Sequence, residues 1–266
     1  MKKKIIGCMM AALMFCFAGC KKEHIHSWDD GHLDNGIMTY TCSKCHETKT
    51  ENKVTLYKET CNEIVETMKN LGEGTEVAAL SNKFVLLSNE DVYIEAEEYD
   101  YIQVLAVAVF VDMLAEFMSN PDFRITEHPV KFTYSYRQIE QGTAVLMYEF
   151  DEKNNEVTMY WDIVSVQGSR TKNIFLYIGV DYNFETRTVE SFEIYTDQES
   201  GGQSNLISWV YENEILKKLN PSADLSGVQT ISDNYAAVLE AKESEIIDLE
   251  ADFSEEYTTA MDRING

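Results

Sequence analysis

The sequence predicts an α+β protein in which a five-stranded antiparallel β-meander packs with long helices and follows a small N-terminal module rich in Cys and His. Residues 130–196 predict the meander because apolar and polar side chains alternate along them, as in strands with one buried face. Apolar residues at helical spacing flank this region on both sides. The chain has 266 residues, is 44% hydrophobic and contains 3 Pro and 13 Gly, a composition typical of regular elements around a buried core.

Two helices and a short hairpin are expected before the meander. Residues 55–71 form an apolar stripe at helical spacing, and Cys61 on that stripe is interpreted as a small buried residue without chemistry. Residues 101–118 are apolar on every face near their centre and stop before Pro121, which predicts a central buried helix. The hairpin is expected over 83–87 and 92–96.

The strands and the C-terminal helices follow from the same two patterns. Turn residues such as Asn154 and Gly168 separate the alternating stretches of the meander. Two further helices are predicted over 205–219, which ends before Pro221, and over 231–264, whose outer face is strongly acidic. The expected strands are 130–136, 144–150, 157–166, 173–182 and 188–196.

The first residues predict export from the cytoplasm. Three Lys at positions 2–4 precede an apolar run over 5–17, which is typical of a signal peptide. The run is too short for a membrane-spanning helix, which needs about 20 apolar residues. We therefore expect this segment to be removed from the mature chain.

The end of that run predicts a lipid anchor. Phe17-Ala18-Gly19-Cys20 resembles the lipobox of bacterial lipoproteins. The resemblance implies that residues 1–19 are the signal peptide, that residues 20–23 are the lipidated N-terminus, and that acyl chains on Cys20 hold the protein on the outer side of the cell membrane. The alternative is an ordinary secretory signal with a chance Cys at this position.

Residues 24–52 contain a set of four candidate metal ligands. His24 and His26 face the same way on an extended strand, and Cys42-x-x-Cys45 supplies two thiolates. Two sulfur and two imidazole ligands in a closed tetrahedron suit Zn²⁺. A segment this short has too few apolar residues to fold without a bound metal ion. We expect a structural zinc ion here, with His32 and His46 as reserve ligands.

The same segment resembles a zinc-ribbon-like repeat module common in cell-surface proteins of anaerobic Gram-positive bacteria. The matching residues are H-x-W-D-x-G at 26–31, Gly36, T-Y-T-C-x-x-C at 39–45 and T-K-T-E at 48–51. In that family Cys often stands at the position of His24, and Gly follows the second Cys where this chain has His46. The resemblance implies a spacer or attachment unit rather than a catalyst.

Two other interpretations of the thiol pair remain open. Cys42-Ser43-Lys44-Cys45-His46 fits C-x-x-C-H, the haem attachment pattern of c-type cytochromes. Three observations argue against haem. The residues on both sides of the motif are polar, no apolar segment around it could form a haem pocket, and haem would give no role to His24 and His26. A redox disulfide of the thioredoxin type needs a βαβ unit, which residues 24–51 cannot build.

The domain over 54–266 carries no recognisable enzyme signature. Nucleotide-binding glycine patterns and the G-x-S-x-G motif are absent, and His128 is the only His beyond residue 51, so neither a catalytic triad nor a two-His metal hydrolase can be assembled. The 46 acidic and 22 basic residues give a net charge of −24, which excludes nucleic acid as a plausible partner. We expect a protein that is not an enzyme, with an unrecognised hydrolase as a weaker alternative.

Apolar residues, most of them aromatic, also lie on the second face of the meander, and three interpretations of them remain open. They are covered by helices, dock another surface protein, or cradle a small apolar ligand. The sequence therefore predicts a membrane-anchored interaction protein, with a carrier for a hydrophobic ligand as the alternative. These residues are Tyr160, Val164, Val166, Phe175, Tyr177 and Tyr195.

Overall fold

The computed structural model describes residues 25–71, 93–137, 140–200, 203–220 and 226–265. Its contacts divide the chain into two compact units, residues 1–32 with 39–50 and residues 33–38 with 51–266. Cys20, His24 and the predicted strand 83–87 lie outside the described residues. The α+β class predicted from the sequence is confirmed.

A small antiparallel sheet is the first regular structure of the described chain. Its strands are β1 (His32–Asp34), β2 (Ile37–Thr41) and β3 (Thr48–Asn52), hydrogen-bonded in this order. Gly36 lies in the turn between β1 and β2 with φ +74°, where a side chain would meet Val54. The turn therefore needs the residue without a Cβ.

The large sheet has nine strands, and the five-stranded meander predicted from the alternation forms its centre. All neighbouring strands are antiparallel except β12, which pairs with β5 in parallel. The spatial order is β12-β5-β6-β7-β8-β9-β10-β11-β4. The strands are β4 (Tyr93–Glu95), β5 (Val130–Tyr136), β6 (Glu140–Asp151), β7 (Glu156–Gln167), β8 (Arg170–Asn183), β9 (Thr188–Ser200), β10 (Gln203–Glu212), β11 (Ile215–Leu219) and β12 (Ile247–Asp252).

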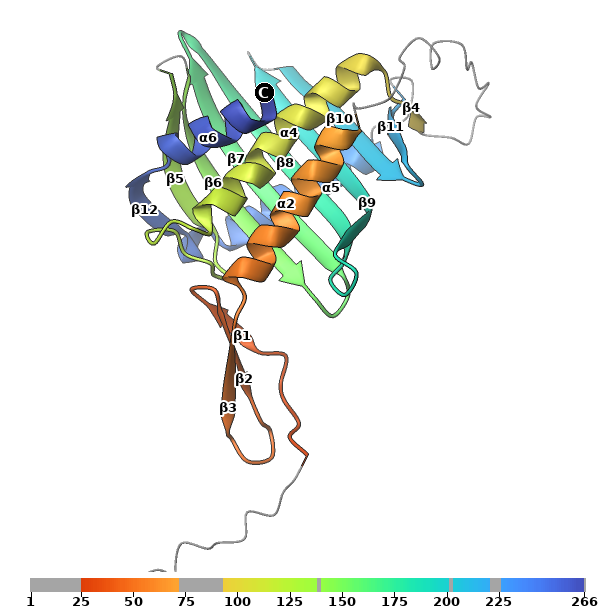
Figure 1. Ribbon diagram of the computed structural model, residues 1–266. Helices are drawn as coiled ribbons and strands as arrows, with labels where there is room; N and C mark the ends of the chain where they lie inside the picture. The colour runs from red at the N-terminus through yellow and green to blue at the C-terminus, as the bar shows by residue number, and fades with distance from the viewer. Residues whose placement is uncertain (1–24, 72–92, 138–139, 201–202, 221–225, 266) are drawn as a thin grey trace, which may run out of the picture. The chain divides into compact units, whose positions relative to one another are not determined.

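Helices cover both faces of this sheet (Figure 1). On one face lie α2 (Val54–Asn70), α4 (Glu98–Phe117) and α6 (Ser254–Asn265), and on the other lies α5 (Ser226–Ala241). The predicted central helix is confirmed, because Val104, Ala108 and Leu114 of α4 are fully buried. Among the described helices, none is long and apolar enough to cross a bilayer.

The helix predicted over 205–219 is wrong, because these residues form the hairpin β10–β11. Asn213 and Glu214 have φ values of 52° and 64° and form its two-residue turn. Positive φ at both turn positions matches the twist of a hairpin, and Asn adopts it readily. Both sides of β10 are partly buried, with Trp209 in the main core and Leu206 on the other face, so the segment lacks a clear alternation.

The single helix predicted over 231–264 is also wrong. It is divided into α5, the 3₁₀ turn Glu243–Glu245, strand β12 and helix α6. Ile247, Leu249 and Ala251 alternate with acidic residues, which is a strand pattern. The apolar residues then pack on two faces of the sheet, because Tyr235 stacks on Tyr177 while Tyr257 and Phe253 join the main core.

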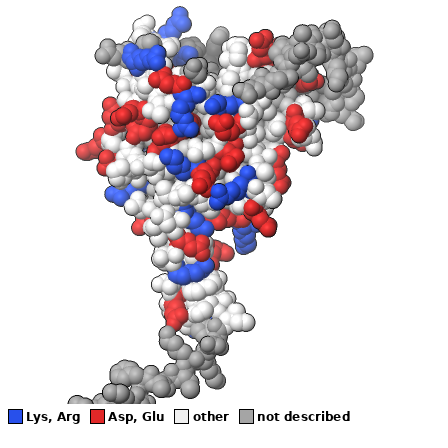
Figure 2. All heavy atoms as spheres, in the orientation of Figure 1, with Lys and Arg blue, Asp and Glu red and all other residues white. Residues whose placement is uncertain are grey.

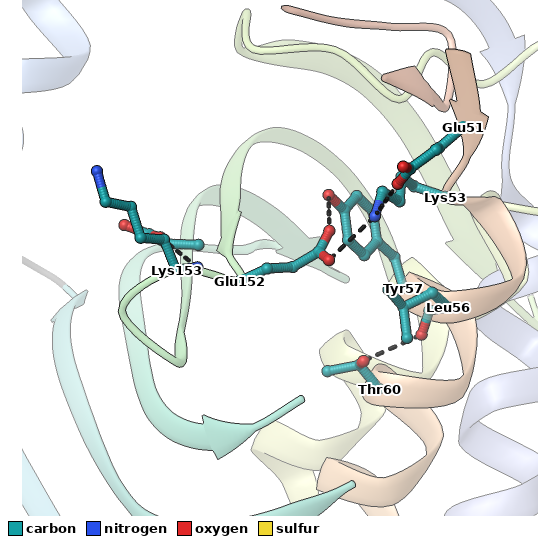
Figure 3. Close-up of polar contacts among 8 residues, drawn as sticks. Glu51, Lys53, Leu56, Tyr57, Thr60, Glu152 and Lys153 are labelled. Carbon is teal, nitrogen blue, oxygen red and sulfur yellow. Dashed lines mark hydrogen bonds and ion pairs between the residues drawn. The ribbon is translucent and has the colours of Figure 1, made fainter. Parts of the chain in front are cut away.

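A buried lysine fixes the start of α2. Lys53 Nζ lies 3.0 Å from Glu51 Oε2 and 3.0 Å from Glu152 Oε2, and the Tyr57 hydroxyl donates to Glu152 Oε1 at 3.2 Å (Figure 3). The cluster joins the end of β3 and the start of α2 to the β6–β7 turn. Because Lys53 is only 7% exposed, its ammonium group is shielded from water and these two carboxylates compensate its charge.

Lys53→Ala is expected to lower the free energy of unfolding by about 2 kcal/mol, because Glu152 loses its cation while remaining hydrated at its exposed side. Urea denaturation of the mature chain measures this change. Lys153→Ala is the matched control, since Lys153 points away from the cluster and is exposed (Figure 3). Equal effects of the two substitutions would contradict the role given to Lys53.

A buried carboxylate lies between α2, α4 and α6. Asp112 is fully buried, and Arg263 Nη1 lies 3.0 Å from its Oδ1. Burial raises the pKa of Asp112 to about 6; Arg263 and Lys69 lower it, whereas Glu116 and Glu66 raise it. Cys61 of α2 is another neighbour, and burial followed by the Asp112 charge raises its pKa.

The raised pKa of Asp112 predicts that stability falls as pH rises from about 4 to about 6. In this window the native state holds a proton that the unfolded chain has lost, so the free energy of unfolding decreases by up to about 3 kcal/mol. Asp112→Asn is expected to remove this component of the pH profile. Asp262→Asn, which removes an exposed partner of Arg137, should leave it in place. Superimposable profiles for the wild type and Asp112→Asn would refute this assignment.

Charges of both signs mix on the face that carries α2, α4 and α6 (Figure 2). Arg187 Nη1 lies 2.6 Å from Glu59 Oε2, and Arg263 Nη1 lies 2.6 Å from Glu116 Oε1. Such exposed pairs contribute little to stability, about 0–1 kcal/mol each. The helices on this face are therefore held mainly by their buried apolar side chains.

Candidate metal centre

Three of the four predicted ligands converge in the first unit. The ligand atoms of His26, Cys42 and Cys45 all lie within 4.8 Å of one another, so these residues can jointly hold a metal ion. Cys45 Sγ lies 3.4 Å from His26 Nδ1, and neither Cys42 nor Cys45 is in a disulfide. His32 and His46, the reserve ligands, are not part of this group of donors.

The turn between β2 and β3 brings the two thiols together. The His46 N–H donates to the Cys42 carbonyl, and the Cys42 N–H donates to the Glu47 carbonyl, both at 2.8 Å. Cys42 also forms an isolated antiparallel bridge with Trp28. This bridge places the segment that carries His26 beside the Cys-x-x-Cys turn.

Asp29 and Gly31 of the H-x-W-D-x-G motif shape the chain that follows His26. Asp29 Oδ1 accepts hydrogen bonds from the N–H groups of Gly31, at 3.1 Å, and Thr41, at 2.8 Å. Gly31 has φ +83°, a conformation that a side chain disfavours. The Asp29 side chain and the turn at Gly31 therefore fold the loop back onto β2, to which Thr41 belongs.

Aromatic stacking fixes the plane of the candidate histidine ligand. The rings of His26 and Trp28 stack with centroids 4.8 Å apart and planes 13° apart. Lys49 Nζ lies 5.5 Å from the Trp28 ring centroid and 4.3 Å from that of Tyr40. Trp28 therefore covers one face of the imidazole and limits its rotation.

His46 occupies a position that favours glycine. Its φ is 60°, in the left-handed region that non-glycine residues enter at a cost of about 1 kcal/mol. Glycine would adopt this conformation without that cost.

The environment of Cys45 favours the neutral thiol in the metal-free protein. Its pKa is raised by desolvation and by the neighbouring Cys42 thiol and Glu47 carboxylate, while a hydrogen bond from the Glu47 backbone opposes the shift. Metal ligation needs the thiolate, so binding must release a proton from this residue. A cation between the two sulfurs would favour the thiolate form of both.

Glu47 also lies at this site, although the sequence does not mark it as a site residue. Glu47 Oε2 lies 3.6 Å from His26 Nε2, the ring nitrogen other than the one that faces Cys45. The only available signal was its position two residues after Cys45, and an acidic residue there is not a recognisable ligand pattern.

The second unit contains a trough on the same face of the large sheet as α5. Its volume is about 380 Å³, and its lining includes no His or Cys. The Tyr177 hydroxyl donates to Glu193 Oε1 at 3.0 Å, and the Ser191 hydroxyl donates to Asp181. Four carboxylates line it, those of Glu156, Asp181, Glu193 and Glu212.

The aromatic residues predicted on this face are covered at least in part by α5. Tyr235 of α5 lies with its ring centroid 4.7 Å from that of Tyr160, 5.7 Å from Phe175 and 4.6 Å from Tyr177. Val164 and Val166 remain more than 40% exposed. Helix packing on both faces of the sheet thus accounts for most of the aromatic residues noted in the sequence.

Comparison of the chain with protein-family models, curated proteins and solved structures gives no match.

Proposed function

We propose that this protein is an extracytoplasmic lipoprotein in which a structural zinc module separates a membrane anchor on Cys20 from an acidic interaction domain. The observation that carries the proposal is the convergence of His26, Cys42 and Cys45 within 4.8 Å. Two thiols and an imidazole are the donors that Zn²⁺ prefers. The anchor rests on the lipobox-like Phe17-Ala18-Gly19-Cys20.

The proposed zinc ion has a structural role. His26, Cys42 and Cys45 would hold it, and His24 would complete the tetrahedron from the segment just before His26. Four protein ligands leave no open position for a substrate or an activated water. The ion would supply folding free energy to a unit whose loops are otherwise fixed by few apolar contacts.

Zinc is favoured over haem and over a redox disulfide by the position of His26. A c-type haem uses both thiols for thioether bonds and takes the His that follows them, so it gives no role to His26. A redox pair needs only the two thiols. The stacking of Trp28 on His26 and the short distance from His26 to Cys45 are explained when the imidazole and the thiols share one ion.

For the second unit we propose binding rather than catalysis. The described trough is lined by four carboxylates, three hydroxyl side chains and several apolar residues, and its lining contains neither a histidine nor a thiol nucleophile. Its four carboxylates support a polar or cationic surface partner over the alternative, an apolar ligand carried against the sheet. The proposed partners are thus the membrane, through Cys20, and a protein at the cell surface.

Native mass spectrometry of residues 21–266, before and after chelation, tests the zinc assignment. One zinc ion per chain that is lost on chelation is the expected result, and a copurifying lipid adduct would favour the carrier alternative. His24→Ala should weaken zinc binding, whereas His46→Gly should retain it. If His46→Gly weakens zinc binding and His24→Ala leaves it unchanged, His46 is the fourth ligand. Chain without metal would refute the proposal.

Membrane fractionation tests the proposed anchor separately. The full chain expressed in a bacterium should partition with membranes, and Cys20→Ala should be released or remain as an unprocessed precursor. Membrane association that is unchanged in Cys20→Ala would refute the lipid anchor and leave the zinc assignment untouched.

A further inference from the structure

We propose that Glu47 positions His26 for metal binding by accepting a hydrogen bond from the outer ring nitrogen of the imidazole. This inference rests on the proposed zinc function and extends it to a residue outside the predicted ligand set. Glu47 would act through His26, so it is a positioning residue and not a ligand.

The two nitrogens of His26 face different partners. Nδ1 lies 3.4 Å from Cys45 Sγ, on the side where the thiols converge, and Nε2 lies 3.6 Å from Glu47 Oε2. The carboxylate is just beyond hydrogen-bonding distance, so a small side-chain rotation makes the bond. Trp28 already restricts the plane of the ring, which leaves its orientation within that plane for Glu47 to fix.

Metal ligation requires this division of roles. A ligating imidazole is neutral, so the nitrogen that binds the ion carries no proton and the other nitrogen carries one. An acceptor at the protonated nitrogen selects this tautomer and increases the basicity of the ligating nitrogen. Glu47 is the carboxylate placed at Nε2, and it is not part of the group of donors formed by His26, Cys42 and Cys45.

The backbone of Glu47 is held by the Cys-x-x-Cys turn itself. Its carbonyl accepts the Cys42 N–H at 2.8 Å, and its backbone also forms a hydrogen bond with the Cys45 thiol. The side chain therefore starts from a fixed point beside both thiols. Because these contacts are made by the main chain, substitution of the Glu47 side chain leaves them in place.

Zinc affinity of residues 21–266, measured by competition with a chelator, tests the proposal. Glu47→Ala is expected to weaken zinc binding about 10–100-fold, the usual loss on removal of such an outer partner. Glu47→Gln should recover most of this loss, because an amide oxygen also accepts a hydrogen bond. Glu185→Ala, which removes one acidic charge from a turn of the second unit, should bind zinc like the wild type.

The visible spectrum of the Co²⁺-substituted protein supplies a readout that a loss of charge alone would not change. The ligand-field bands should shift in Glu47→Ala and return towards the wild-type positions in Glu47→Gln. Two results would overturn the positioning role while the zinc function stands. One is that Glu47→Ala keeps the zinc affinity and the Co²⁺ spectrum of the wild type. The other is that Glu47→Ala and Glu47→Gln lose equal zinc affinity while the spectrum stays unchanged. A wild-type chain that binds no zinc would overturn both.

Discussion

Cys45→Ser is expected to weaken zinc binding by residues 21–266 more than about 100-fold and to leave the first unit without its fold. The Cys45 thiol lies 3.4 Å from His26 Nδ1, and its loss removes one of the three donors that converge there. A serine hydroxyl remains protonated near neutral pH and is a poor ligand for zinc. Because binding supplies the folding free energy of such a small unit, ordering and metal affinity should be lost together.

Zinc titration followed by mass and by the near-ultraviolet signal of Trp28 measures both losses. Cys61→Ala is the matched control, because Cys61 is buried on α2 and belongs to the second unit. It should bind one zinc ion like the wild type. Stoichiometric, tight zinc binding in Cys45→Ser would show that the ion is held elsewhere.

Phe117→Ala is expected to lower the free energy of unfolding of the second unit by about 4 kcal/mol. Phe117, near the end of α4, is fully buried. Its ring centroid lies 4.8 Å from that of Phe132 on β5, 4.9 Å from Phe123 and 4.4 Å from Phe253, just before α6. Alanine would leave a cavity where a helix, a strand and a loop meet.

Urea denaturation followed by circular dichroism measures the effect of Phe117→Ala. Phe117→Leu, which keeps most of the volume, should lose about 1.5 kcal/mol or less. Zinc stoichiometry should be unchanged in both variants, because the donors belong to the first unit. A loss below about 1 kcal/mol in Phe117→Ala would mean that this aromatic cluster does not stabilise the unit.

The elements that could be predicted from the sequence each carry a clear burial pattern of their own. In strands β5–β9 every second residue faces the main core, and polar residues such as Lys131 and Asp162 stand among those on the other face. The central part of α4 has no polar face at all, which also gives an unambiguous pattern. In both cases the burial pattern is encoded within a single element.

The elements that were missed depend on partners that are distant in sequence. Strand β10 is partly buried on both faces, with Trp209 in the main core and Leu206 on the other face, so its periodicity is weak. Residues 247–252 do alternate, but their parallel partner is β5, more than a hundred positions earlier. The alternation is therefore visible in the sequence, but the distant partner that makes this segment a strand is not.

The candidate site was predictable where spacing defines the ligands. The C-x-x-C pair and His26 are brought together by the structure, as their types and spacing indicated. Glu47 could not be predicted because an outer partner has no fixed spacing from the ligand that it orients. Its role depends on which nitrogen of His26 faces the thiols, and this is a property of the folded turn.

X-ray absorption at the zinc edge of residues 21–266 identifies the ligand atoms of the proposed zinc ion. We expect a four-coordinate zinc ion with two sulfur ligands at about 2.3 Å and two imidazole nitrogens at about 2.0–2.1 Å. Cys45→Ser should remove one of the sulfur ligands or all of the bound metal. A shell of oxygen ligands without sulfur, or sulfur without imidazole, would contradict the assignment of Cys42, Cys45 and His26.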